Sequence, residues 1–443
     1  MVAFCFCGAI IGLNLKLTYK EGEFVQRLKY NKNQILYIVE AALEYFISVL
    51  VMGSYLATLT THLGFSDSLT GVLSSVISLG GLFQLGSMFI RRRKMKRFVV
   101  IFSIINQLFF TLLYVVPFFE FSAAVKRVVF VIIIILAYLV YNITHPKKVN
   151  WLMSLVDDGI RGRFTANKEI VSLLSGVGFT FLMGNIVDYF NEKGEIKTAF
   201  IICGITIFIL TVGHTLSMIF TSEIEELSPA KNQKLFSQIA ETFKNKDTQK
   251  ITLLFVLWYI AKGISEPFNS VYMIKELGFS LTFISVLTIV QSVIRVLCSR
   301  ALGSYADKNS FAKMLRICFV FAFIGFVASA IARPSNGSIA FTLHFMAHGV
   351  SLAGINSALI NLIFDYVPHE NRADSLAVTQ SLSGLMGFVS TFAAGFLVTY
   401  IQKSGNMFFG VSVYAQQVLN LISAIATVCI ILFLQFGIIN KKK

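Results

Sequence analysis

Long runs of apolar residues, separated by short polar segments, extend over almost the whole chain. A helix of about 20 apolar residues is long enough to cross the roughly 30 Å hydrocarbon layer of a bilayer. An even number of such helices places both ends of the chain on one side of the membrane. We predict twelve transmembrane helices near residues 34–60, 68–90, 97–118, 126–155, 168–190, 198–220, 251–273, 282–302, 311–332, 338–364, 375–400 and 412–439.

The amino-acid composition supports a membrane protein and excludes several other classes. Hydrophobic residues make up 56% of the 443 residues and charged residues 14%, whereas soluble domains contain about 25% charged residues. This balance excludes a disordered chain and a collagen-like fibre. The six cysteines are scattered and lie mostly within apolar runs, so we expect neither a disulfide framework nor a zinc site.

The longest polar stretch lies between the sixth and seventh predicted helices, at residues 221–250. Within it, Leu235, Ile239 and Phe243 recur every four residues among lysines. This spacing predicts either an amphipathic helix on the membrane surface or a flexible linker. The predicted organisation is a cytoplasmic N-terminal segment, a six-helix bundle, the linker and a second six-helix bundle, at residues 1–33, 34–220, 221–250 and 251–443.

The net charge of +15 indicates the orientation of the chain in the membrane. Most of the 38 Lys and Arg residues fall in loops on the side of the two termini, above all in the segment from Arg91 to Arg97. Lys126 and Arg127 lie on the opposite side. The positive-inside rule therefore predicts cytoplasmic termini, and we expect a plasma-membrane protein. Since no basic stretch is long and soluble enough to form a domain, we expect no nucleic-acid partner.

The two halves of the chain share short matching segments, as in transporters that arose by duplication. The segment Leu63–Ser66 (LGFS) recurs at Leu277–Ser280, 214 residues later. Nine residues in and just before the fifth predicted helix match residues in and just before the eleventh at an offset of 211: Val156, Arg161, Ala166, Gly176, Thr180, Phe181, Gly184, Val187 and Tyr189 match Val367, Arg372, Ala377, Gly387, Thr391, Phe392, Gly395, Val398 and Tyr400. These repeats predict two bundles of six helices with parallel orientation.

The loop after the eighth predicted helix contains a glycine followed four residues later by an aspartate and then by basic residues: Gly303, Asp307, Lys308 and Lys313. It resembles the signature loop of the major facilitator superfamily. The copy after the second helix is degenerate, because Ile90 stands where the aspartate would be. The resemblance extends in topology over essentially the whole chain. It implies an all-α polytopic membrane protein with twelve transmembrane helices in two pseudo-symmetric six-helix bundles.

The same resemblance implies a cytoplasmic gate. Arg161 and Arg163 before the fifth helix and Arg372 before the eleventh are similar to cytoplasmic turns of the family. Gly303, Asp307 and Lys308 would form a latch with the amino end of the fifth helix; the alternative is a solvated surface. Drug exporters of the family usually carry a glycine- and proline-rich fifth helix, and residues 168–190 contain no proline. This departure disfavours a multidrug/proton antiporter, which stays an alternative.

Ionisable residues inside a membrane helix are costly and usually line a cavity or form pairs. Glu40 and Glu44 lie four residues apart on one face of the first predicted helix. Lys147 and Lys148 lie at a comparable depth in the fourth helix. These acids and amines can form pairs whose separation allows a carboxylate to take a proton. Proton-coupled peptide carriers of the superfamily resemble this arrangement. The alternative is that the two lysines extend to the membrane interface.

The second half contains further charges at membrane depth. Lys262 and Glu266 stand four apart in the seventh predicted helix and are followed by Pro267. They form either a self-neutralising pair or part of a substrate site, in which Pro267 releases a carbonyl that faces a cavity. Arg295 in the eighth helix is expected to meet either an anionic substrate group or an acidic partner. His344 and His348 share one face of the tenth helix, but too few further ligands accompany them to predict a metal site.

These patterns predict a secondary transporter that moves a small polar solute by alternating access, coupled to protons through Glu40 or Glu44. The chain contains no HExxH, GxSxG or GxxxxGK[ST] motif, so we expect no enzyme activity and no cofactor. A membrane-embedded enzyme and a sensor are the alternatives from other classes. The expected partners are the solute, a coupling proton and the bilayer, with the protein acting as a monomer.

Overall fold

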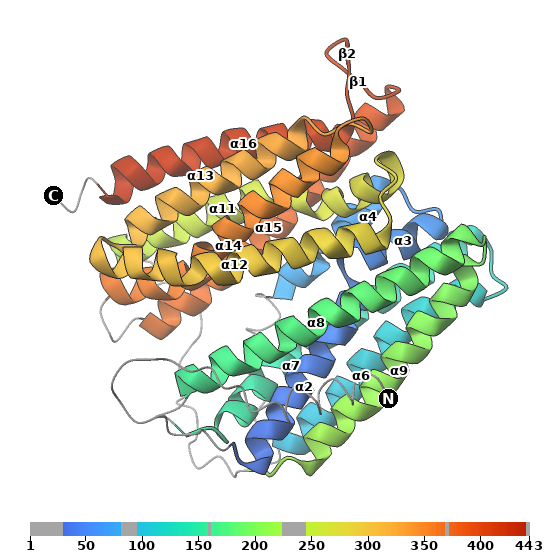
Figure 1. Ribbon diagram of the computed structural model, residues 1–443, viewed down its shortest axis with the longest axis horizontal. Coiled ribbons are helices and arrows are strands. Elements are labelled where there is room, and N and C mark those ends of the chain that lie inside the picture. The colour runs from blue at the N-terminus through green and yellow to red at the C-terminus, as the bar shows by residue number, and fades with distance from the viewer. Residues whose placement is uncertain (1–29, 81–94, 158–160, 224–244, 368–371, 440–443) are drawn as a thin grey trace.

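The computed structural model describes residues 30–80, 95–157, 161–223, 245–367 and 372–439. This part of the chain contains eleven helices that are long and apolar enough to cross a membrane. The expected helix at 68–90 is described only as far as residue 80, and the expected amphipathic helix lies largely outside the described residues. Figure 1 shows the helices gathered into two bundles, one from each half of the chain.

The first bundle contains α2 (Lys32–Val51), α3 (Gly53–His62), α4 (Asp67–Ser75), η1 (Val76–Leu79), α6 (Met95–Val115), η2 (Val116–Phe118), α7 (Ala123–Met153), α8 (Arg161–Glu192) and α9 (Ile196–Phe220). The second contains α11 (Lys246–Val271), η4 (Tyr272–Glu276), α12 (Leu281–Lys308), α13 (Phe311–Ala330), α14 (Gly337–Tyr366), α15 (Arg372–Lys403), α16 (Ala415–Phe433) and η6 (Leu434–Ile439). A two-stranded antiparallel hairpin of β1 (Met407–Phe408) and β2 (Val411–Ser412) precedes α16.

Several helix boundaries differ from the prediction: α8 begins at Arg161 instead of residue 168, and α12 continues to Lys308 instead of ending at 302, so Gly303 and Asp307 lie in a helix and not in a loop. Two further differences lie within apolar runs. The first helix is broken between α2 and α3 because Gly53 adopts a positive φ of 54°, which ends the regular helix although the apolar run continues. The expected last helix, 412–439, begins at Ala415, since residue 412 belongs to the hairpin.

The seventh predicted helix starts earlier than residue 251 because Asn245 caps α11. The Asn245 side chain accepts hydrogen bonds from the backbone N–H groups of Asp247 at 2.8 Å and Thr248 at 3.2 Å. These bonds satisfy two of the N–H groups that a helix start leaves without partners. The helix therefore begins within the polar stretch, at Lys246.

The internal repeat is visible in the backbone. Helices α8 and α15 have the same length of 32 residues, and their first residues are 211 positions apart. In the repeated LGFS segments, Gly64 and Gly278 both adopt positive φ values, 71° and 66°. Ser66 and Ser280 both cap the helix that follows by accepting a backbone N–H hydrogen bond. The predicted two-bundle fold with related halves is confirmed.

The two bundles approach each other most closely at the end where α3, α4 and the hairpin lie (Figure 1). Helix α4 packs against α11 and α15, and α8 packs against α12. Glycines permit this approach: a Cβ atom on Gly395 of α15 would lie 2.7 Å from Ser68 of α4, and one on Gly184 of α8 would lie 3.2 Å from the backbone of Leu281. Gly184 and Gly395 match each other in the internal repeat. Each of them contacts the first turn of a helix in the other bundle.

Candidate functional site

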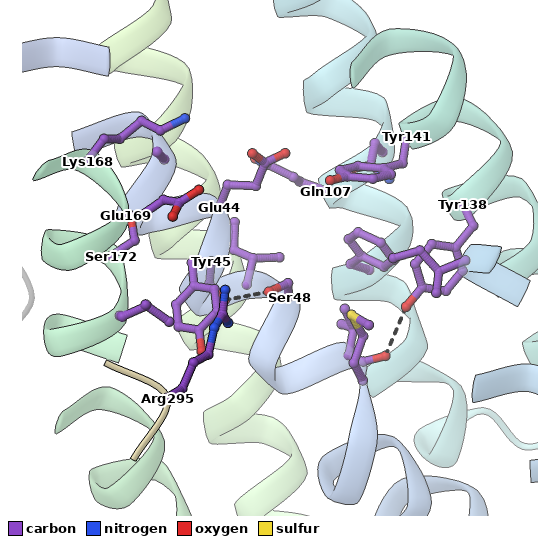
Figure 2. Close-up of a pocket in the computed structure, with 18 residues that line it drawn as sticks. Glu44, Tyr45, Ser48, Gln107, Tyr138, Tyr141, Lys168, Glu169, Ser172 and Arg295 are labelled. Atoms are coloured by element: carbon purple, nitrogen blue, oxygen red, sulfur yellow. Dashed lines mark hydrogen bonds between the residues drawn. The ribbon is translucent and has the colours of Figure 1, made fainter. Parts of the chain in front are cut away.

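A pocket of about 350 Å³ lies beside the C-terminal half of α2. Of its described lining residues, Arg295 alone comes from the second bundle (Figure 2). The polar and aromatic lining residues are Glu44, Tyr45, Ser48, Asn106, Gln107, Phe110, Tyr138, Tyr141, Lys168, Glu169, Ser172 and Arg295. A pocket with four charged groups, several hydroxyl and amide groups, and aromatic walls suits a small polar solute.

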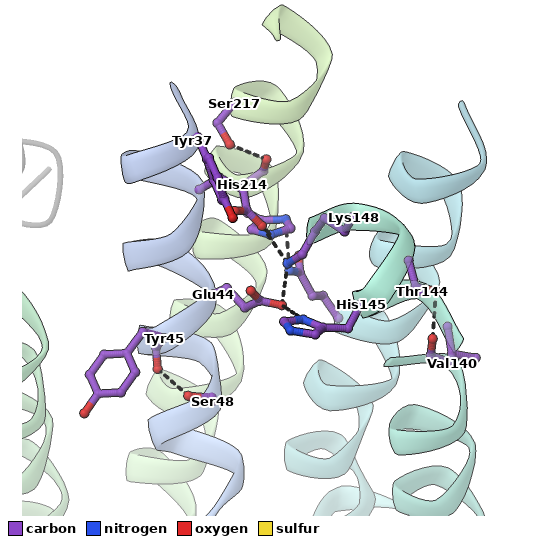
Figure 3. A network of polar contacts seen from close by, with 12 residues as sticks. Tyr37, Glu44, Tyr45, Ser48, Val140, Thr144, His145, Lys148, His214 and Ser217 are labelled. Carbon is purple, nitrogen blue, oxygen red and sulfur yellow. Dashed lines mark hydrogen bonds and ion pairs between the residues drawn. The ribbon is translucent and has the colours of Figure 1, made fainter. Parts of the chain in front are cut away.

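Lys148 of α7 joins the two glutamates of α2. Its Nζ atom lies 2.6 Å from Glu40 Oε1 and 2.6 Å from Glu44 Oε1. Glu40 and Lys148 are almost fully buried, whereas the Glu44 side chain is 24% exposed and lines the pocket. Figure 3 shows Lys148 pointing between Glu44 and His214. The structure thus brings together three of the seven predicted substrate or coupling residues.

Lys147 behaves differently from its neighbour. Adjacent residues of a helix point in directions about 100° apart, so only one of the two lysines can face α2. Lys147 is half-buried, and no ion pair joins it to another residue in the described part of the chain. His145, one turn before Lys148, places its Nδ1 atom 4.0 Å from Glu44 Oε1. A pairing role for Lys147 therefore stays a prediction.

His214 of α9 completes the buried cluster. Its Nε2 atom lies 2.9 Å from Glu40 Oε1, and its Nδ1 atom lies 3.0 Å from Gln107 Nε2 of α6. His214 is fully buried. The cluster contains two carboxylates and one ammonium group, so it has one excess negative charge when both histidines are neutral. A buried excess charge is unfavourable unless a further cation or proton compensates it.

A second charged group lines the pocket on the side of α8 and α12. Lys168, Glu169 and Arg295 lie there, next to Tyr45 and Ser172 (Figure 2). Together the three charged residues have one excess positive charge. None of the described acidic residues lies within ion-pair distance of Arg295. Its predicted acidic partner is therefore absent from the described part of the chain, and an anionic substrate group stays the open alternative.

The second bundle has its own polar cluster. Lys262 Nζ lies 3.3 Å from Glu266 Oε2 within α11, and His348 Nε2 of α14 lies 3.1 Å from Glu266 Oε1. The sequence did not predict a carboxylate near His344 and His348. His344 instead donates from Nδ1 to the carbonyl of Gly325 at 2.9 Å. The Lys262 side chain is 40% exposed, so this pair is not sealed within the protein.

Pro267 has a different consequence from the one expected. It removes the N–H group that would bond to the carbonyl of Gly263. The hydroxyl group of Thr391 on α15 donates to that carbonyl at 2.7 Å. The released carbonyl is therefore satisfied between α11 and α15, and the expectation that it faces a cavity is wrong.

The predicted gate residues are only partly described. Asp307 and Lys308 are exposed in the last turn of α12, and a Cβ atom on Gly303 would meet no atom within 4 Å. Arg161, Arg163 and Arg372 lie in the first turns of α8 and α15, but their side chains fall outside the described part. The latch between these residues stays a prediction.

One group of side chains among the described residues has the geometry of a metal site. The ligand atoms of Glu40, Glu44 and His214 all lie within 4.8 Å of one another. The ammonium group of Lys148 already contacts both carboxylates at 2.6 Å. A metal ion would have to displace this ammonium group, so the donor set favours the internal cation over a metal.

Sequence reasoning missed His214, Gln107 and Tyr141. His214 is an isolated histidine in the apolar run of α9, and an ionisable residue at membrane depth is itself a signal of function. Gln107 and Tyr141 carry no such signal, because amides and tyrosines also occur in helix interfaces. Their place in the pocket depends on how α6 and α7 pack.

Two related bundles of membrane-spanning helices, with a pocket that the first bundle lines and Arg295 of the second completes, have the architecture of a membrane transporter. The sequence profile of the Major Facilitator Superfamily matches residues 41–391, and the chain belongs to this family. No curated protein matches the chain. The family prediction is confirmed.

Solved structures of transporters share the fold. A mutant of the nucleoside transporter NupG superposes with a TM-score of 0.70 at 14% identity, covering 91% of this chain and 99% of that chain. A D-xylose–proton symporter gives 0.64 at 14% identity, covering 91% and 96%. A bacterial homologue of the iron transporter ferroportin, also 14% identical, gives 0.64 in its inward-facing state, covering 90% and 98%, and 0.56 in its outward-facing state, covering 91% and 97%.

Proposed function

We propose that the protein is a proton-coupled secondary transporter for a small polar solute that carries one negative charge. The observation behind this proposal is the division of charge along the pocket. The cluster of Glu40, Glu44 and Lys148 has one excess negative charge. The other charged lining residues, Lys168, Glu169 and Arg295, have one excess positive charge, and Lys168 lies between the two groups, where it donates to the Tyr37 hydroxyl at 3.3 Å.

A proton and a monoanion together would neutralise both sides of the pocket. The proton would compensate the buried carboxylates, and the anion would pair with Arg295 and Lys168. Binding of either one alone leaves an uncompensated charge in a low-dielectric environment. Joint binding is therefore favoured, and this is the physical basis of symport.

Alternating access requires the bundles to move relative to each other. The close contacts between α4 and α15, and between α8 and α12, support a conformation that is closed at the α3–α4 end. The higher TM-score to the inward-facing ferroportin homologue supports the same state. With the basic loops on the side of the termini, we infer that the pocket opens toward the cytoplasm.

Two measurements test the function. The first is a thermal-stability screen of the purified protein against organic acids, amino acids, sugars, nucleosides and a lipophilic cation, because a ligand that binds the folded state raises the melting temperature. We expect a monoanion to stabilise most. Stabilisation by the lipophilic cation alone would support the multidrug antiporter instead.

The second measurement is uptake of the best stabilising solute into proteoliposomes with and without a pH gradient. The Glu40→Gln, Glu44→Gln double variant should lose gradient-driven uptake. Glu195→Gln is the matched control, because Glu195 is exposed at the start of α9. Full gradient-driven uptake by the double variant would refute proton coupling at this cluster.

A further inference from the structure

Gln107 connects the buried charge cluster to the pocket. Its Nε2 atom lies 3.0 Å from His214 Nδ1, whereas its Oε1 atom is buried and has no hydrogen-bond partner among the described residues. Gln107 also lines the pocket beside Glu44 (Figure 2). A buried acceptor without a partner is unfavourable, and it indicates that a ligand group or a rearrangement satisfies it.

The neighbours of His214 determine which of its nitrogens carries hydrogen. Glu40 accepts a hydrogen bond from Lys148 at 2.6 Å and faces His214 Nε2 at 2.9 Å. The carboxylate can only accept, so His214 Nε2 carries the hydrogen. In the neutral imidazole Nδ1 is then an acceptor. Gln107 must offer its amino group to Nδ1, and its carbonyl oxygen stays buried at the edge of the pocket without a hydrogen-bond partner among the described residues.

Protonation of His214 reverses this arrangement. Both nitrogens of an imidazolium are donors, so the amino group of Gln107 and His214 Nδ1 would then oppose each other. Rotation of the Gln107 amide by about 180° restores the hydrogen bond, since the carbonyl oxygen can accept from Nδ1. The same rotation puts the amino group in the place of the carbonyl oxygen, at the edge of the pocket.

We propose that Gln107 is a positioning residue that converts the protonation state of His214 into a change of hydrogen-bond polarity in the solute pocket. This inference rests on the proposed transport function and adds a way in which proton binding changes the affinity for the solute. With neutral His214, Gln107 places an acceptor at the edge of the pocket, which disfavours an anion. With protonated His214 it presents a donor, which favours one by about tenfold or more in affinity.

Several ionisable groups surround His214 and belong to the same equilibrium. Glu40 and Glu44 face it from α2 and Lys148 from α7. His145 of α7 and Lys168 of α8 lie one shell further out, against Glu44 and Tyr37 respectively. A proton that enters the cluster can therefore reside on a carboxylate or on His214, and the test must observe His214 itself.

The test is solid-state NMR of the full-length protein in lipid bilayers, with ¹⁵N-labelled His and Gln side chains and no added solute. At high pH we expect a ¹⁵N–¹⁵N contact between Gln107 Nε2 and His214 Nδ1. On protonation of the imidazole this contact should be lost. Gln107→Met and His214→Gln assign the signals, and Gln416, whose amide donates to Asp67, is the internal control.

Two results would overturn the inference. The contact could persist after His214 has become an imidazolium, or His214 could bind no proton between about pH 5 and 9. If Gln107→Met fails to fold, the His214→Gln variant alone assigns the contact. Because no solute or gradient is used, a negative result leaves the uptake experiment as an independent test of the proposed function.

Discussion

Asp67 Oδ1, in the first turn of α4, lies 2.7 Å from Lys275 Nζ in the second bundle. The other carboxylate oxygen accepts hydrogen bonds from Gln402 at 2.7 Å and Gln416 at 3.3 Å. All three donors belong to the second bundle, and the Asp67 side chain is only 3% exposed. Asp188 of α8 adds a second link by accepting from the backbone N–H groups at the start of α12. These contacts join the two bundles at the α3–α4 end.

Replacement of Asp67 by Asn should favour opening at this end. Hydrogen bonds to charged groups contribute about 1.5–3 kcal/mol, and a loss of about 1.4 kcal/mol shifts an equilibrium about tenfold. In a background without native cysteines, the buried Ser285→Cys below the contact should react about tenfold faster with a membrane-impermeant maleimide added from that side. Asp247→Asn is the control, because the ion pair of Asp247 in the described part of the chain is with Lys250 of its own helix. An unchanged labelling rate in Asp67→Asn would show that this contact does not hold the end closed.

The two adjacent lysines of α7 should differ sharply in their contribution to stability. Removing one partner of a buried ion pair leaves an uncompensated charge and costs about 3–5 kcal/mol. Lys148→Gln should therefore lower the melting temperature strongly. Lys147→Gln should change the free energy of unfolding by no more than about 0.5 kcal/mol. Equal melting temperatures of the two variants would contradict the assignment of Lys148 as the buried partner.

The sequence predicted the pairing of the acids on α2 with a lysine on α7, because depth and helical spacing can be read from the apolar runs. It could not distinguish Lys147 from Lys148, since this choice depends on the rotation of α7 about its axis. It also could not predict His214 beside Glu40, because these residues are 174 positions apart. Such a contact follows from tertiary packing and leaves no local pattern.

Two tyrosines that were not among the matched residues also follow the internal repeat. Gly176 of α8 packs against Tyr45 of α2, and the equivalent Gly387 of α15 packs against Tyr259 of α11. The two tyrosines are 214 positions apart, the same offset as the LGFS segments. The break at Gly53, in contrast, was hidden because an apolar run continues through it.

Thr391→Val should destabilise the protein because it leaves the carbonyl of Gly263 without a donor. A buried polar group without a partner costs about 1–3 kcal/mol. Thr399→Val is the matched control, since its hydroxyl group donates to a carbonyl of its own helix, that of Gly395. Thermal unfolding of both variants measures the difference.

A double-mutant cycle tests the same explanation. Pro267→Ala restores an N–H group that can bond to the Gly263 carbonyl. In the Thr391→Val background, this second substitution should recover part of the lost stability. Additive destabilisation by the two substitutions would mean that Thr391 does not compensate for the proline.

Two helical glycines should respond in opposite ways to alanine. A Cβ atom on Gly263 would collide with the backbone of Gly387 and with Ser390, so Gly263→Ala should destabilise the α11–α15 interface by about 1–3 kcal/mol. A Cβ atom on Gly303 would meet no atom within 4 Å, so Gly303→Ala should stabilise α12 by up to about 1 kcal/mol through higher helix propensity. Thermal unfolding of the two variants checks both signs. A destabilised Gly303→Ala variant would indicate that this glycine is needed for a close contact at the predicted gate.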